Sequence, residues 1–397
     1  MADDAPPPPA AETPNGPQKD LETLLNDERT LRTFTEQVLD CRQIELEVSE
    51  VENKRLLKKI DLLTKELSET RTQLLEARAH LKTKDRNLQE AGDQIFRLQS
   101  HRQDITESEA REAYKALCDK IQRWVENRLP LTLEGISSGN LKKPSPAQAA
   151  KFLSLLREPA KRCLTIHHSD EYHIAAAISY YLWLAFFSKP FYCPLDDSTE
   201  DATILWIVGI ESAMAKFRDA EHCREWRSET LVALSSQKSF KSRRETYIHL
   251  ISKDLSSYMT TAFPKISVAE LQSSLRKAVV QPAADLAHRF HTSSSMFWLK
   301  WPLKTASTRL EVYECSNLAD GGRTVDLSGT SPESAVRRDV RYLFDIAPGL
   351  FVERVEGGRK LPLKAICRPK VLVHGNQSQV THRATLLTWL YSATREG

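Results

Sequence analysis

The stretch that decides the fold is "LEVSEVENKRLLKKIDLLTKELSETRTQLLEARAHLKTKDRNLQEAGDQIFRL", residues 46–98. If position a of a seven-residue repeat is placed at Leu46, every seventh residue as far as Ile95 is leucine or isoleucine, except for Asn53. The d positions are more mixed, with leucine at 56, 63 and 98. A sustained heptad with charged flanking positions is typical of a left-handed coiled coil. The stretch therefore predicts a long helix that packs against another helix.

We expect the apolar a and d positions, together with Asn53, to form a homodimer interface. Asparagine at a single a position fixes register and favours two strands, at a cost in stability. Most outer positions suit a parallel pair, because Glu66 at g can meet Arg71 at e of the other chain. However, Glu45 would face Glu50. The expected oligomerisation residues are Leu46, Asn53, Leu56, Ile60, Leu63, Leu67, Leu74, Leu81, Leu88, Ile95 and Leu98.

The repeat also has weak points. The d positions from Thr70 to Ala91 carry threonine, alanine and lysine, which make thin layers, and Gly92 lowers helix propensity. The same stripe could therefore cover the chain's own globular domain, or the helix of a different protein. Upstream, Leu24, Leu31 and Val38 form another a series. The step from Val38 to Leu46 is eight residues, so the phase slips and we expect a local irregularity at 39–45.

Composition points to an intracellular protein. The 56 basic and 53 acidic residues leave a net charge of +3, which gives no whole-chain argument for nucleic acid or membrane as a partner. The seven cysteines form no C-x-x-C pair, as expected of reduced thiols. The acidic, proline-rich start does not resemble a signal peptide, and no apolar run reaches the roughly 20 residues of a membrane span. We expect a cytoplasmic or nuclear location.

Four regions follow from the changes in pattern along the chain. Residues 1–19 hold six prolines and few large apolar side chains, which predicts a disordered tail. The coiled coil is expected over 20–108 and an α-helical domain over 109–293. Residues 294–397 are expected to form a small β-containing subdomain, with strands within 308–315 and 340–373 and a closing helix at 381–394. The predicted fold class is therefore mainly α.

Local signals refine the helical domain. Pro130, Gly135 and Gly139 predict a break over 130–144, and a serine-capped helix follows from Ser145. Further helices are expected at 198–217, with acids in the first turn, and at 221–234, 243–263 and 268–290. Pro282 should kink or split the last of these. The basic run 238–245 is interpreted as the start of a helix, and the run 319–334 as a loop.

The stretch "CLTIHHSDEYHIAAAISYYLWLAFFS", residues 163–188, is the one that most resembles a chemical site. Three histidines, His167, His168 and His173, could meet a zinc ion. However, Ser169 is a natural N-cap and Asp170 suits a first turn, which explains the polar segment without a metal. We expect no metal there or at the histidine–cysteine pair 222–223.

The apolar part of the same stretch predicts a helix buried in the globular domain. Its 16 uncharged residues, 173–188, are too few to cross a bilayer. We therefore expect Trp183, Leu184 and Phe187 to be buried.

No known catalytic or nucleotide-binding motif occurs, so we expect no catalytic residue and no cofactor. The aromatic and basic residues of "MFWLKWPLK", 296–304, could stack on single-stranded nucleic acid, but we interpret them as core packing. The expected function is that of a protein-interaction or scaffold protein that binds itself and an unidentified protein partner. A nucleic-acid or chromatin regulator and an enzyme of unrecognised type remain the alternatives.

Two segments carry a family resemblance. These are "YKALCDKIQRWVENRL", residues 114–129, and "VRYLFDIAPGLFVERVEGGRKL", residues 340–361, with "ICRPKVLV" closing at 373. Over residues 109–375 the chain resembles proteins of filamentous fungi that join an N-terminal coiled coil to a C-terminal helical domain. That family has no established activity, so the resemblance implies an architecture and no functional residue.

Overall fold

The computed structural model describes residues 17–99, 104–197, 201–302, 310–325, 340–375 and 385–395. The chain forms two compact units, Met1–Leu88 and Gln89–Gly397. The fold is mainly helical, with a small β region near the C-terminus, which confirms the predicted fold class at this level. Most of the predicted disordered tail, residues 1–16, lies outside the described residues.

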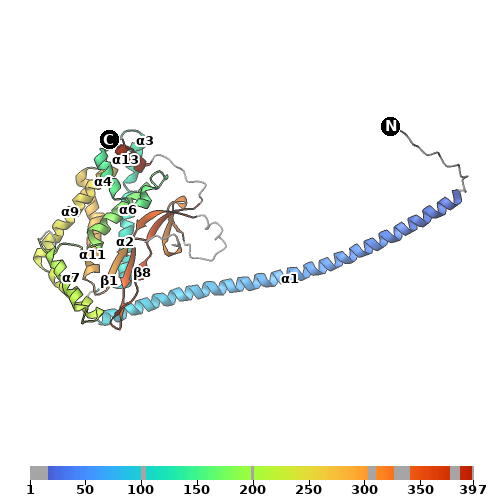
Figure 1. The fold of residues 1–397 in the computed structure, drawn as a ribbon, viewed down its shortest axis with the longest axis horizontal. Helices are drawn as coiled ribbons and strands as arrows, with labels where there is room; N and C mark the ends of the chain where they lie inside the picture. Colours follow the sequence, from blue (N-terminus) through green and yellow to red (C-terminus); the bar gives the residue numbers. More distant parts are fainter. Residues whose placement is uncertain are drawn as a thin grey trace, which may run out of the picture. The chain divides into compact units, whose positions relative to one another are not determined.

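Helix α1 runs from Pro17 to Gln99 (Figure 1). It is continuous through 39–45, so the irregularity expected there does not interrupt the helix, and Gly92 is helical as well. Exposed pairs of opposite charge one turn apart support it, such as Arg32 with Glu28 at 2.8 Å. Every side chain from Glu22 to Leu88 is exposed, so the unit that this part of the helix forms has no core of its own.

The second unit begins with four helices. Helix α2 (Glu107–Glu126) starts at a capping box between Thr106 and Glu109, and it buries an apolar face that includes Trp124. Helix α3 (Leu129–Ser137) occupies part of the segment 130–144, so the break predicted there was wrong for these residues. Pro130 lies in the first turn of α3, where proline is tolerated. Helix α4 (Pro146–Ser154) begins at the predicted Ser145 cap, and the short α5 (Glu158–Lys161) follows.

Helix α6 (Asp170–Leu182) lies in the core and continues into a π-helical turn, η1 (Trp183–Phe187). Trp183 and Phe187 pack against the core and are partly buried. Leu184 is 41% exposed, so its predicted burial was wrong. The uncharged run predicted burial on every face, but the helix is covered on some faces only, and isolated leucines on a surface are common.

The remaining helices of the helical region match four of the predicted segments. They are α7 (Ala202–Met214), α8 (Ala220–Ser235), α9 (Lys238–Ala262) and α10 (Val268–Leu275), which passes through a π turn, η2 (Arg276–Val280), into α11 (Gln281–Thr292). Pro282 lies at the start of α11, so the expected disruption is present as the π turn before it. The first turn of α7 contains no acid, contrary to expectation. Asp196 instead accepts the Thr203 N–H at 2.7 Å.

The β region contains two main sheets. One has the order β1 (Met296–Lys300), β5 (Gly349–Glu353), β8 (Lys364–Cys367), and the other β3 (Arg323–Val325), β2 (Glu314–Asn317), β9 (Lys370–His374), β4 (Arg341–Ala347). Strands β6 (Val355–Glu356) and β7 (Arg359–Lys360) form a hairpin whose turn glycines both have positive φ. The strands predicted over 340–373 are confirmed. Of the strand expected at 308–315, the described part begins with a 3-10 turn, η3 (Leu310–Val312), and only its last two residues belong to a strand, β2.

The larger of two hydrophobic clusters among the described residues joins the helices to the sheets. It contains residues from α2, α6, α9, α11, β1, β4 and β5, and from the closing helix α13 (Leu386–Arg395). Polar contacts add to it, since the Tyr114 hydroxyl donates to the Pro348 carbonyl oxygen at 2.5 Å and Arg224 pairs with Glu353. The last predicted helix thus exists, within the part of 381–394 that the structure describes. Of the loop predicted over 319–334, the structure describes 319–325, which contain the end of a 3-10 turn, η4 (Leu318–Asp320), and strand β3; the rest lies outside the described residues.

Candidate functional site

The first candidate is the apolar row along α1. Eight of its predicted interface residues are between 49% and 73% exposed in the single chain, and Asn53 is exposed as well. Ile95 and Leu98 lie on the same helix, but the structure does not describe their side chains. The eight exposed apolar residues are Leu46, Leu56, Ile60, Leu63, Leu67, Leu74, Leu81 and Leu88.

This row has the geometry of an extended interface. From Leu46 to Leu88 it covers roughly 63 Å, at about 1.5 Å per residue. An a/d stripe drifts about 20° per heptad on a straight α-helix, and supercoiling of two helices corrects that drift. Soluble chains rarely leave a contiguous apolar surface of this extent uncovered. The row is therefore a surface that a second helix fits.

Sequence reasoning missed several exposed apolar side chains on α1, because an a/d template ignores other positions. They occupy b, c, e and f of the repeat: Val48, Val51, Leu57, Leu62 and Leu75. Val48 had a detectable signal, because Phe34 and Cys41 are the d positions of the upstream repeat and Val48, seven residues after Cys41, continues that series beyond the phase slip. The others have no periodic signal in the sequence.

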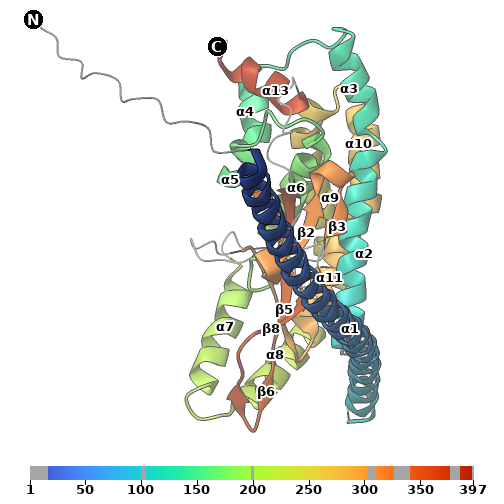
Figure 2. The same cartoon turned by 90° about the vertical axis from the view of Figure 1, so that its right-hand side faces the viewer.

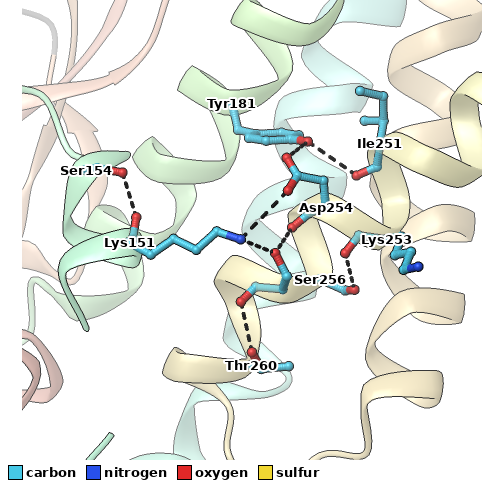
Figure 3. A network of polar contacts seen from close by, with 9 residues as sticks. Lys151, Ser154, Tyr181, Ile251, Lys253, Asp254, Ser256 and Thr260 are labelled. Atoms are coloured by element: carbon cyan, nitrogen blue, oxygen red, sulfur yellow. Dashed lines mark hydrogen bonds and ion pairs between the residues drawn. The ribbon is translucent and has the colours of Figure 1, made fainter. Parts of the chain in front are cut away.

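A second candidate is a polar network that joins α4, α6 and α9 (Figure 3). The Lys151 ammonium donates to the Ser257 hydroxyl oxygen at 2.7 Å and lies 3.9 Å from the Asp254 carboxylate. The Tyr181 hydroxyl donates to the same carboxylate at 2.7 Å. A lysine beside a serine is an arrangement that some hydrolases use, with the lysine as base.

The detailed contacts of this network favour a structural role. Ser257 donates its own proton to the Asp254 carbonyl oxygen at 2.6 Å, so its hydroxyl is not directed at a base. The ammonium also lies 4.3 Å from the centre of the Tyr258 ring, in a cation–π contact. Burial and the Asp254 carboxylate raise the pKa of Tyr181, which keeps this hydroxyl a donor. The network thus links α4, α6 and α9 and stabilises their packing.

A third candidate is a small hollow between α5, α6 and β4. The Arg157 guanidinium forms an ion pair with the buried Asp345 at 2.8 Å and lies over the Trp301 ring at 4.8 Å. The Trp301 indole N–H is buried without a hydrogen-bond partner. The free space is about 10 Å³, which suits a single water molecule. The hollow is too small for a substrate.

The histidines do not form a common site. His173 is fully buried, with Nδ1 2.8 Å from the Ser169 carbonyl oxygen and Nε2 3.1 Å from that of Ala160. Burial lowers the pKa of His173 to about 4, so the ring is neutral at pH 7 and donates to one carbonyl only. His167 and His168 precede the helix, as expected. Across the described ranges, no group of three or more histidine, cysteine or acidic side chains is placed to hold a metal ion.

Ser169 and Asp170 differ from expectation in an informative way. Ser169 is at the N-cap position of α6, but its hydroxyl donates to the Ile166 carbonyl oxygen at 2.6 Å and does not cap the helix. Asp170 lies in the first turn as predicted, yet its carboxylate accepts the Leu386 N–H at 3.1 Å and the Leu387 N–H at 3.4 Å. Burial raises the pKa of Asp170 to about 6. This carboxylate therefore caps α13.

Comparisons with known proteins do not assign a family. No protein-family model matches the chain, and no curated protein or solved structure is significantly similar to it. Among the helices of the described residues, none has both the length and the apolar character needed to cross a bilayer. Function must therefore be argued from the surfaces of the molecule.

Proposed function

We propose that this protein is an interaction or scaffold protein that self-associates through α1. The observation that carries the proposal is the row of eight leucine and isoleucine side chains, spaced as a heptad and exposed in the single chain. A helix of this length without a core of its own normally owes its stability to packing against a partner. A second copy of the chain carries a matching repeat and is present wherever the protein is made.

The energetics support a dimer of moderate affinity. Burying one such side chain contributes about 1.5–3 kcal/mol. Bringing two chains together costs roughly 4–15 kcal/mol, so several layers are enough to exceed that cost. The thin d layers between Thr70 and Ala91 reduce the surplus.

Two features favour a parallel, two-stranded arrangement. Asn53 at a is exposed, and in a parallel pair it would face its counterpart and form a polar layer that fixes the register. The g and e positions then place Glu66 opposite Arg71 and His80 opposite Asp85 of the second chain. Such pairs contribute orientation more than strength, because all four side chains are exposed to solvent.

Light scattering of the unmodified full chain at micromolar concentration tests the proposal. One chain has a mass of 45.1 kDa, and we expect twice that mass. A monomer mass over the whole concentration range would refute self-association. It would direct attention to a helix from a different protein or to the chain's own globular unit. Affinity capture with and without residues 1–88 would then identify any partner that depends on α1.

A further inference from the structure

Helix α7 is apolar on both of its faces. One face contacts the rest of the unit through the buried Ile204 and Ile207, and Glu211 pairs with Arg227 of α8 at 2.9 Å. The opposite face is exposed and carries Leu205 and Trp206, which are 55% and 61% exposed. In Figure 2, α7 lies at the edge of the globular unit beside α8. A helix that is apolar all round is normally covered on all sides, so this outer face calls for a partner.

The exposed face is symmetric about Gly209. At 100° per residue, four exposed residues of α7 form pairs that lie within about 60° of its direction and equally far before and after it in sequence. The two pairs are Leu205 with Ala213 and Trp206 with Ser212. In both pairs the large residue precedes the centre and the small residue follows it. Gly209 has no atom within 4 Å of the position its Cβ would take, so the centre of the face is open.

We propose that this face binds the same face of a second copy of the chain, with the two α7 helices antiparallel and Gly209 at the two-fold axis. In that arrangement Leu205 lies at the level of Ala213 of the other copy, and Trp206 at the level of Ser212. Each large side chain thus extends over a small one, which allows the helices to approach closely. An interface of this kind is self-complementary, as two-fold symmetry requires.

The charges at the two ends of α7 fit the same arrangement. Asp197 and Asp201 lie just before α7, and the Asp197 side chain is 87% exposed although it pairs with Arg243 at 3.8 Å. Lys216 and Arg218 lie just after the other end, and both are exposed. Antiparallel pairing brings the acidic end of each helix to the basic end of the other, and it also opposes the two helix dipoles. A parallel pair would place like charges together at both ends.

The area available predicts a weak contact. Trp206 and Phe217, the latter 73% exposed, present roughly 100–150 Å² each, given that such aromatic side chains carry about 150–250 Å². With the smaller residues, the pair would bury less than the roughly 1,200 Å² of a stable interface. A tether that raises the effective concentration to the millimolar range would compensate. The strength of the contact, though not its location, therefore rests on the proposed dimerisation through α1.

Disulfide trapping tests the geometry directly in the full chain. Cysteine is introduced by Gly209→Cys in a Cys41→Ser background, because Cys41 is exposed. Facing helices with axes about 8–10 Å apart bring the two Cα atoms at the axis to roughly 3.5–5.5 Å, close to the span of a disulfide. The matched control, Ala202→Cys, lies on the same face of α7, but the two introduced thiols would be about 21 Å apart along the helices. We expect at least tenfold more linked dimer from Gly209→Cys than from Ala202→Cys.

Further variants separate this contact from the one made by α1. Adding Trp206→Asp to Gly209→Cys should lower the linked fraction at least tenfold, while an unchanged thermal unfolding transition shows that the unit is folded. Light scattering of the same samples reports independently whether α1 holds two chains together. If α1 does not hold two chains together, the disulfide-trapping comparison is repeated at a protein concentration of about a hundred micromolar. Equal linking at both positions, or no linking from Gly209→Cys at that concentration, would overturn the proposal.

Discussion

Two double variants of α1 that differ only in heptad position give the sharpest test of the coiled coil. Leu67→Lys with Leu74→Lys places charge at two a positions. Leu62→Lys with Leu75→Lys makes the same chemical change at c and b. In the single chain the exposed fractions are 69% and 49% for the first pair and 59% and 56% for the second, so a monomer would tolerate both changes equally. Leucine and lysine have similar helix propensity, so neither change should unfold α1.

The expected difference is large because a dimer buries each a position twice. Four leucines lost from the interface remove about 6–12 kcal/mol, at 1.5–3 kcal/mol for each side chain. Since about 1.4 kcal/mol corresponds to tenfold in affinity, even the lower value weakens dimerisation at least ten-thousandfold. Repulsion between the new ammonium groups adds to the loss.

Light scattering over a concentration series at micromolar levels measures the result. We expect a monomer mass for the a-position variant and a dimer mass for the control. The thermal unfolding transition of the globular unit should be the same in both. A dimer that survives the a-position changes, or that is lost equally in both variants, would show that the heptad does not define the interface.

Three further predictions concern single residues. In a parallel pair, Cys41 faces its counterpart at a d position, so mild oxidation should link two chains and Cys41→Ser should prevent it, as gel electrophoresis without reductant will show. Leu184→Asp should cost less than about 1 kcal/mol because the side chain is partly exposed, whereas Phe186→Ala in the core should cost about 3–5 kcal/mol in chemical denaturation. Burial lowers the pKa of His173 from 6.5 to about 4, so its contribution to stability, about 3 kcal/mol, is present above pH 6.5 and is lost as pH falls through 4. His173→Gln should therefore flatten the pH dependence of the unfolding free energy between pH 4 and 6.5.

Much of the helical architecture was predictable because its signals are local. Ser145 marks the start of α4 and Pro282 marks the disruption before α11, since both act through their own backbone. The strands of 340–373 follow from β-branched residues between glycine and proline turns. The break expected at Pro130 shows the limit of such signals. Proline ends one helix and begins another with the same φ, and only the residues around it decide between the two.

The side chains of the 163–188 stretch were harder to predict because their partners are distant in sequence. Asp170 suits a first turn in any helix, but the N–H groups that it accepts belong to residues 386 and 387. His173 is held between two carbonyl groups, one of them 13 residues earlier. Neither contact has a periodic signature. The sequence therefore predicts that the spacing of the histidines does not suit a metal ion, but it does not identify the groups that Asp170 and His173 contact.

The two proposed interfaces differ in the same respect. The seven-residue period of α1 distinguishes one stripe from the rest of that helix, so the candidate surface can be read from sequence alone. The segment "ATILWIVGIESAM" of α7 has apolar residues on every side, and no period separates those that face the core from those that do not. Only the burial of Ile204 and Ile207 in the structure defines the outer face and shows that it is centred on Gly209. On a helix that is apolar all round, an interface can therefore be identified only when the structure shows which face is buried in the core.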